Sequence, residues 1–119
     1  MKRALPAALA LCATLIATAA AAEFVPIRDE AKFVQIVADK TLTRPLVSLS
    51  VAPTGRIAGS GAAWEVTGQW TWQNGYFCRD LSWGGTDLGY NCQEVRVRDN
   101  KIRFISDRGT GEYADFRLR

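Results

Sequence analysis

Carboxylates, arginines and cysteines are the residues of this chain that could do chemistry, because the sequence contains no histidine. Without histidine, there is no Ser-His or Cys-His pair to activate a nucleophile and no conventional histidine metal site. An acid and a base of the kind that glycoside hydrolysis requires could come from four carboxylates: Glu65, Asp80, Asp87 and Glu94. A small hydrolase or lyase that uses Asp80, Asp87 or Glu94 is therefore one hypothesis.

Arg79, in the segment "YFCRD", is the cation best placed to recognise a ligand. One interpretation is an anion-binding group at the mouth of a pocket, with Trp70, Trp83 and Tyr90 as walls. The alternative is a structural arginine stacked on the Trp70 indole, which would close one end of the fold.

The loop "WGGTDLGYN" is the second candidate for ligand contact. Its glycines allow close approach of the backbone, and Asp87, Tyr90 and Asn91 supply polar groups. The alternative for the tryptophans around this loop is that they form the core, because large aromatic rings are the main packing units of a small sheet protein.

Residues 1–22 have the features of an export signal. Lys2 and Arg3 precede an apolar run, and Ala20 and Ala22 form an A-x-A arrangement that predicts cleavage before Glu23. The apolar run is shorter than the roughly 20 residues of a membrane-spanning helix, so we expect no span in the mature chain. The prediction is one domain at 23–119, periplasmic or secreted.

Cys78 and Cys92 are the two cysteines of the predicted mature domain. An even number of cysteines in an oxidising compartment indicates a disulfide, whereas two cysteines without histidine make a poor zinc site. We therefore expect one disulfide and no metal. A loop of about 15 residues closed in this way contributes roughly 3 kcal/mol in the chain-entropy model.

The segment "WEVTGQWTWQNGYFCRDLSW" predicts a β-hairpin. Apolar and polar residues alternate strictly through residues 64–73, and Asn74-Gly75 is typical of a type I′ turn. This turn places Trp72 opposite Phe77, Trp70 opposite Arg79, and Cys78 on the polar face opposite Thr71. Glu65, Asp80 and Glu94 then also face outward, which favours solvated side chains over catalytic ones.

The next strand agrees with this register. If Val95 and Val97 face inward, Cys92 faces outward, beside Cys78 on the neighbouring strand. A turn at Asp99-Asn100 then brings Ile102 opposite Val97. Residues 116–118 supply a last strand.

An amphipathic segment, "DEAKFVQIVADK", predicts one helix capped by Asp29. The fold class expected is all-β with this short N-terminal helix: an antiparallel meander of about seven strands forming a small barrel or half-barrel, with the helix over one opening.

The net charge of the chain does not favour a nucleic-acid partner. The full chain has a net charge of +3, and without Lys2 and Arg3 the domain has thirteen basic and twelve acidic residues, a net charge of +1. A local cluster of basic residues lacks interleaved aromatic residues and is interpreted as a solvated strand face. It comprises Arg96, Arg98, Lys101, Arg103 and Arg108.

With "VTGQWTWQNGYFCRDLSWGG", "LGYNCQEV" and "IRFISDRGTG", the chain resembles a family of short exported proteins of alphaproteobacteria, with a shared G-x-W-x-W…G-x-F-C-R…C pattern. The resemblance implies export but no particular activity. Some members carry the label dihydrodipicolinate reductase, which implies a dinucleotide-binding domain. No G-x-G-x-x-G follows a strand here, so we expect no cofactor and do not adopt that activity.

The function expected is a non-catalytic binding or inhibitor-like module of the envelope, analogous at the level of fold to small exported lysozyme inhibitors. Its partner would be an envelope protein or a small ligand. The alternatives are the carboxylate-dependent hydrolase or lyase and a purely structural envelope protein.

Overall fold

The computed structural model describes residue 4, residues 10–14 and residues 23–119. Most of the predicted export signal lies outside these residues. The described chain forms, in order, β1 (Val25–Ile27), α1 (Glu30–Val37), β2 (Leu42–Arg44), β3 (Val47–Val51), β4 (Arg56–Gly61), β5 (Trp64–Gln73), β6 (Tyr76–Trp83), β7 (Thr86–Arg98), β8 (Lys101–Ile105), α2 (Ser106–Gly109) and β9 (Tyr113–Leu118).

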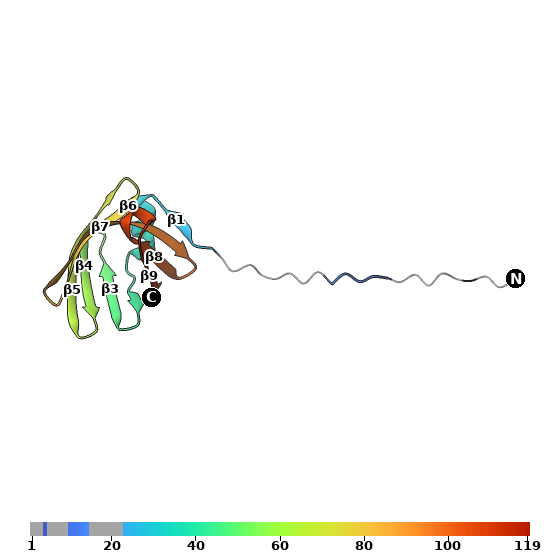
Figure 1. The fold of residues 1–119 in the computed structure, drawn as a ribbon, viewed down its shortest axis with the longest axis horizontal. Coiled ribbons are helices and arrows are strands. Elements are labelled where there is room, and N and C mark those ends of the chain that lie inside the picture. Colours follow the sequence, from blue (N-terminus) through green and yellow to red (C-terminus); the bar gives the residue numbers. More distant parts are fainter. Residues whose placement is uncertain (1–3, 5–9, 15–22) are drawn as a thin grey trace.

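The strands form a closed antiparallel barrel of eight strands, with β1 added as a ninth (Figure 1). Closure depends on β7, which is 13 residues long. The part of β7 before Glu94 pairs with β6, and Glu94–Arg98 pairs with β8. At Val95–Val97, β1 pairs with the edge of β7 that β6 has left free.

The predicted all-β barrel with one N-terminal helix is therefore confirmed, with more strands than the expected seven or so. The additional strands are β1 and β2, with three residues each. Three residues are too few for a period-two pattern to show in a sequence.

The β5–β6 hairpin has the predicted register. Trp72 lies opposite Phe77, Trp70 opposite Arg79, and Thr71 opposite Cys78. Asn74 and Gly75 both have positive φ, 52° and 84°, as a type I′ turn requires.

Helix α1 covers one opening of the barrel. The side chain of Asp29 accepts a hydrogen bond from the Lys32 backbone N–H at 3.3 Å, which is the predicted N-cap. On the inner side of the helix, Phe33 is fully buried, with its ring 5.0 Å from Trp72, 5.3 Å from Trp70 and 5.2 Å from Phe77, centroid to centroid.

Two glycines allow neighbouring strands to approach closely. A Cβ atom at Gly59 would lie 2.0 Å from the Ser48 carbonyl oxygen, and one at Gly68 would lie 2.1 Å from that of Asp80. Any side chain at these positions would force β4 away from β3, or β5 away from β6.

Candidate functional site

A cavity of about 160 Å³ lies inside the barrel. Most of its wall is apolar, and the polar side chains in it are Arg79 and Gln93. Strands β2, β3, β4, β6, β7, β8 and β9 all contribute inward-facing residues. The apolar lining comprises Leu42, Leu49, Val51, Ile57, Phe77, Leu81, Phe104, Ala114 and Phe116.

Arg79 lies on the inner face of β6, between Trp70 of β5 and Asn91 of β7. It is half-buried, and its Nη1 donates a hydrogen bond to the Gly89 carbonyl oxygen at 2.8 Å. Burial lowers the pKa of the guanidinium, and the negative charge of the adjacent Asp80 partly opposes this shift.

No carboxylate in the described part of the chain forms an ion pair with Arg79. The ion pairs there are Glu94–Arg96 and Arg103–Asp115. The predicted alternative, Arg79 stacked on Trp70, is also not among the cation–π contacts of these residues. A guanidinium has five N–H donors, so one hydrogen bond to Gly89 leaves most of its donor capacity unused.

Gln93 and Asn91 attach α2 to β7. The buried Gln93 donates from Nε2 to the Ser106 hydroxyl at 3.1 Å. Asn91 donates to the Asp107 carboxylate and accepts from the Asp107 backbone N–H, both at 2.9 Å. These bonds hold Asp107 and Arg108 in left-handed backbone conformations, with φ of 54° at each. Asn91, predicted as a ligand group, thus has a structural partner.

The two tryptophans proposed as pocket walls lie outside the cavity lining. Trp70 is only 5% exposed, packs against Phe33, and donates from Nε1 to the Ala52 carbonyl oxygen at 2.9 Å. At the barrel end, Trp83 donates to the Gly61 carbonyl oxygen at 2.8 Å and meets Trp64 edge to face.

Tyr90 and Asp87 lie on the outer surface of β7. The Tyr90 hydroxyl oxygen is 3.4 Å from Cys92 Sγ and accepts a hydrogen bond from Gln73 at 3.3 Å. Asp87 accepts from the Gly89 backbone N–H at 2.8 Å, which holds the turn that presents the Gly89 carbonyl to Arg79.

The carboxylates of the enzyme hypothesis are separated from the cavity. Asp80 and Asp87 are both exposed and line a shallow groove on the outer face. Glu65 is exposed on β5, and Glu94 forms an ion pair with Arg96 on β7. In the described residues, no cluster of three or more Cys, Asp or Glu side chains is arranged to hold a metal.

The predicted disulfide joins Cys78 and Cys92, which are directly opposite each other on β6 and β7. Their Cα atoms are 3.9 Å apart. The bond therefore links the two strands that carry Arg79, Gly89 and Gln93.

Comparisons with protein-family models, curated proteins and solved structures found no match to this chain. No helix among the described residues is both long and apolar enough to cross a bilayer.

Sequence reasoning missed Gln93 as a site residue. The sequence does indicate that Gln93 faces inward, because Asn91 and Gln93 are polar residues on the same parity as the inward-facing Val95 and Val97. The other missed residues are apolar, and nothing in a single strand distinguishes a residue that lines a cavity from one that packs in a filled core.

Proposed function

We propose that this protein is an exported, non-catalytic binding module whose barrel holds a small carboxylic acid with an apolar body. Residues 1–22 would direct it to the envelope, in line with the resemblance to exported alphaproteobacterial proteins. The domain 23–119 would then act in the periplasm or outside the cell.

The observation that carries this proposal is Arg79 in the wall of a cavity whose lining is otherwise apolar except for Gln93. Arg79 is half-buried and has no ion-pair partner among the described residues, which is costly for a cation, and a bound carboxylate would offset that cost. Because guanidinium and carboxylate groups form paired N–H···O bonds, Arg79 would set both the charge and the orientation of the ligand.

The size of the cavity limits the apolar part of the ligand. An apolar cavity of about 150 Å³ in another protein accepts benzene, so about 160 Å³ suits a single ring or a short alkyl chain. Benzoate and hexanoate are therefore suitable probes. Acetate has too little apolar surface to bury, and benzyl alcohol has the ring without the charge.

The test is a tryptophan-fluorescence titration of the oxidised protein, since Trp70 lies opposite Arg79 on the neighbouring strand. We expect saturable binding of benzoate or hexanoate, and much weaker binding of acetate and benzyl alcohol. Arg79→Gln is expected to weaken carboxylate binding at least about tenfold, because hydrogen bonds to charged groups contribute 1.5–3 kcal/mol. Arg79→Lys keeps the charge and should lose less affinity.

Two controls make the result specific to the cavity. Arg56→Gln removes an exposed cation on β4, and Glu65→Gln removes an exposed carboxylate on β5. Neither should change carboxylate affinity. Ala114→Leu adds bulk to the cavity wall and should reduce binding while the fold is retained. Equal affinity in the wild type and Arg79→Gln, or equal affinity for benzyl alcohol and benzoate, would contradict the proposal.

A further inference from the structure

Three basic residues lie side by side across the outer face of β7, β8 and β9. Arg98 is directly opposite Lys101, and Lys101 is directly opposite Arg117. The residues adjacent to them in the chain, Val97, Ile102 and Phe116, belong to the core or pack against it, so the three basic side chains point outward. We call Arg98, Lys101 and Arg117 the cationic row.

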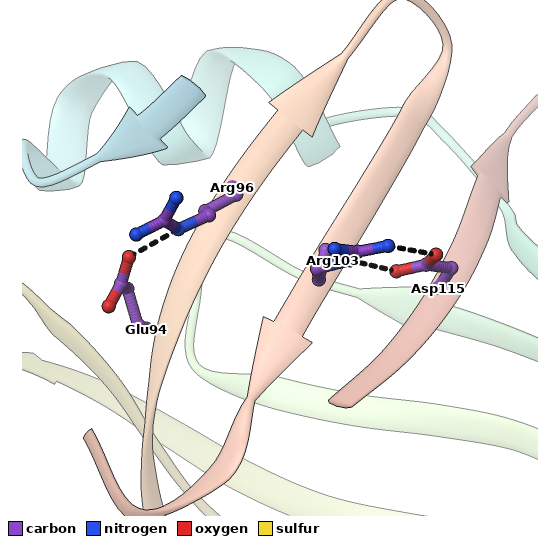
Figure 2. A network of polar contacts seen from close by, with 4 residues as sticks. All are labelled: Glu94, Arg96, Arg103 and Asp115. Atoms are coloured by element: carbon purple, nitrogen blue, oxygen red, sulfur yellow. Dashed lines mark hydrogen bonds and ion pairs between the residues drawn. The ribbon is translucent and has the colours of Figure 1, made fainter. Parts of the chain in front are cut away.

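In the next row of the same sheet, the two arginines each have a carboxylate partner (Figure 2). There, Arg103 makes two hydrogen bonds to Asp115, at 2.7 and 2.9 Å, and Arg96 is paired with Glu94. These are the ion pairs of the described chain, and none includes a member of the cationic row. Like charges directly opposite each other on neighbouring strands destabilise a sheet. The Asp115 carboxylate, which Lys101 and Arg98 help to keep ionised, and the Phe24 ring 4.5 Å from the Arg98 guanidinium carbon offset only part of this cost, because Asp115 is already bonded to Arg103.

A groove of about 450 Å³ lies beside the row. Its lining includes Lys101 and Arg117 of the row, together with Thr43, Arg44 and Arg119. Asp115 is the carboxylate side chain in the lining, and Arg103 already engages both of its oxygens. An anion that crosses the row would continue into a second set of cations.

From this arrangement we infer that the outer face of β7–β9 binds an acidic polysaccharide with one negative charge per sugar unit. The cationic row runs across the strands, and side chains directly opposite each other are spaced roughly 5 Å apart. That spacing is close to the length that one sugar unit adds to an extended chain. The Thr43 hydroxyl and the groove offer hydrogen-bonding partners for the sugar.

Single-stranded nucleic acid fits this surface less well, because its bases need free aromatic faces. Two rings of this face, Phe24 and Tyr113, are engaged by arginine, and the guanidinium carbon of Arg98 in the row is 4.5 Å from the ring centre of Phe24. The guanidinium carbon of Arg103 is 4.0 Å from the ring centre of Phe24 and 3.9 Å from that of Tyr113. Phe24 and Tyr113 therefore stack on arginines rather than offer free faces to bases.

The test is calorimetric titration of the oxidised full chain with short polyuronate oligosaccharides, at two salt concentrations. We expect saturable binding that weakens as salt is raised. The double variant Lys101→Gln/Arg117→Gln should bind about tenfold more weakly. Because it relieves repulsion between like charges, its melting temperature should stay the same or rise, which separates lost binding from lost folding.

Two variants serve as controls. Arg56→Gln removes the same type of charge from β4, four strands away from β8 in either direction around the barrel, and should bind like the wild type. Arg79→Gln should also bind polyuronate normally. A failure of the carboxylate-cavity proposal would therefore leave this inference unaffected, and the reverse also holds.

Three results would overturn the inference. These are no binding of polyuronate, unchanged affinity in the double variant, and equal or tighter binding of oligothymidylate or polyphosphate at the same salt. A neutral oligosaccharide of the same length should not bind.

Discussion

Trp70 shows how a single residue joins several parts of this protein. Its indole is buried on β5 against Phe33 of α1, and its N–H reaches the Ala52 carbonyl in the β3–β4 turn. One side chain therefore connects β5 to the helix over the barrel opening and to the β3–β4 turn. The indole N–H has its hydrogen-bond partner, so burial leaves no polar group of the side chain unsatisfied.

Trp70→Ala is expected to lower the free energy of unfolding by roughly 3–5 kcal/mol, the usual cost of truncating a large core aromatic residue. Trp70→Phe keeps a ring but loses the hydrogen bond to Ala52 and part of the volume, so it should cost less. Urea denaturation followed by circular dichroism measures both. An unchanged midpoint for Trp70→Ala would mean that Trp70 is not part of the core.

At the scale of elements, β8 and β9 are joined by the Arg103–Asp115 pair as well as by their backbone (Figure 2). Hydrogen bonding from Arg103 lowers the pKa of Asp115, and partial burial works against this shift. Because the folded-state pKa lies below the unfolded value, the ionised pair stabilises the fold above the ordinary aspartate pKa of about 3.9. This contribution is lost as the pH falls through the folded-state value.

Asp115→Asn should therefore destabilise the protein at neutral pH by up to about 1 kcal/mol, the range for a partly exposed ion pair. The difference from the wild type should shrink as the pH is lowered below about 3.9. Chemical denaturation over a pH series measures this. Glu65→Gln, an exposed carboxylate on β5, is the matched control and should show little effect. A pH-independent loss of stability in Asp115→Asn would mean that packing, rather than charge, accounts for it.

At the scale of the whole molecule, the barrel is closed by pairings between distant parts of the chain, and the disulfide adds a covalent link between β6 and β7. The two cysteines are 14 positions apart. A domain below 100 residues buries a modest fraction of its surface, so a cross-link that restricts the unfolded chain is a large part of its stability.

Cys78→Ala/Cys92→Ala is expected to lower the free energy of unfolding by about 3 kcal/mol, the loop-entropy value for a bridge of this length. Reduction of the wild type should have a similar effect, and reductant should not change the double variant. Urea denaturation with and without reductant tests this. Arg79 and Gln93 of the cavity lie on the two strands that the bond joins, so carboxylate affinity should also fall on reduction. Equal stability of oxidised and reduced wild type would contradict the prediction.

The order of amino acids alone predicts the elements whose signals are local. Alternation along β5 and the Asn74-Gly75 turn were enough to predict the β5–β6 register, because a two-residue turn leaves one alignment of the strands. The same parity places Cys78 and Cys92 on one face, in agreement with the disulfide between them. The amphipathic pattern after Asp29 likewise predicted α1.

Features that depend on several strands at once become visible only in the folded chain. The β8–β9 register follows a loop that is held by Asn91 and contains left-handed residues, so the alignment of Lys101 with Arg117 could not be read locally. The cavity around Arg79 depends on how inward-facing side chains from seven strands fill the closed barrel. Alternation predicts which side chains face inward, but whether they fill the interior depends on the strand pairing that closes the barrel.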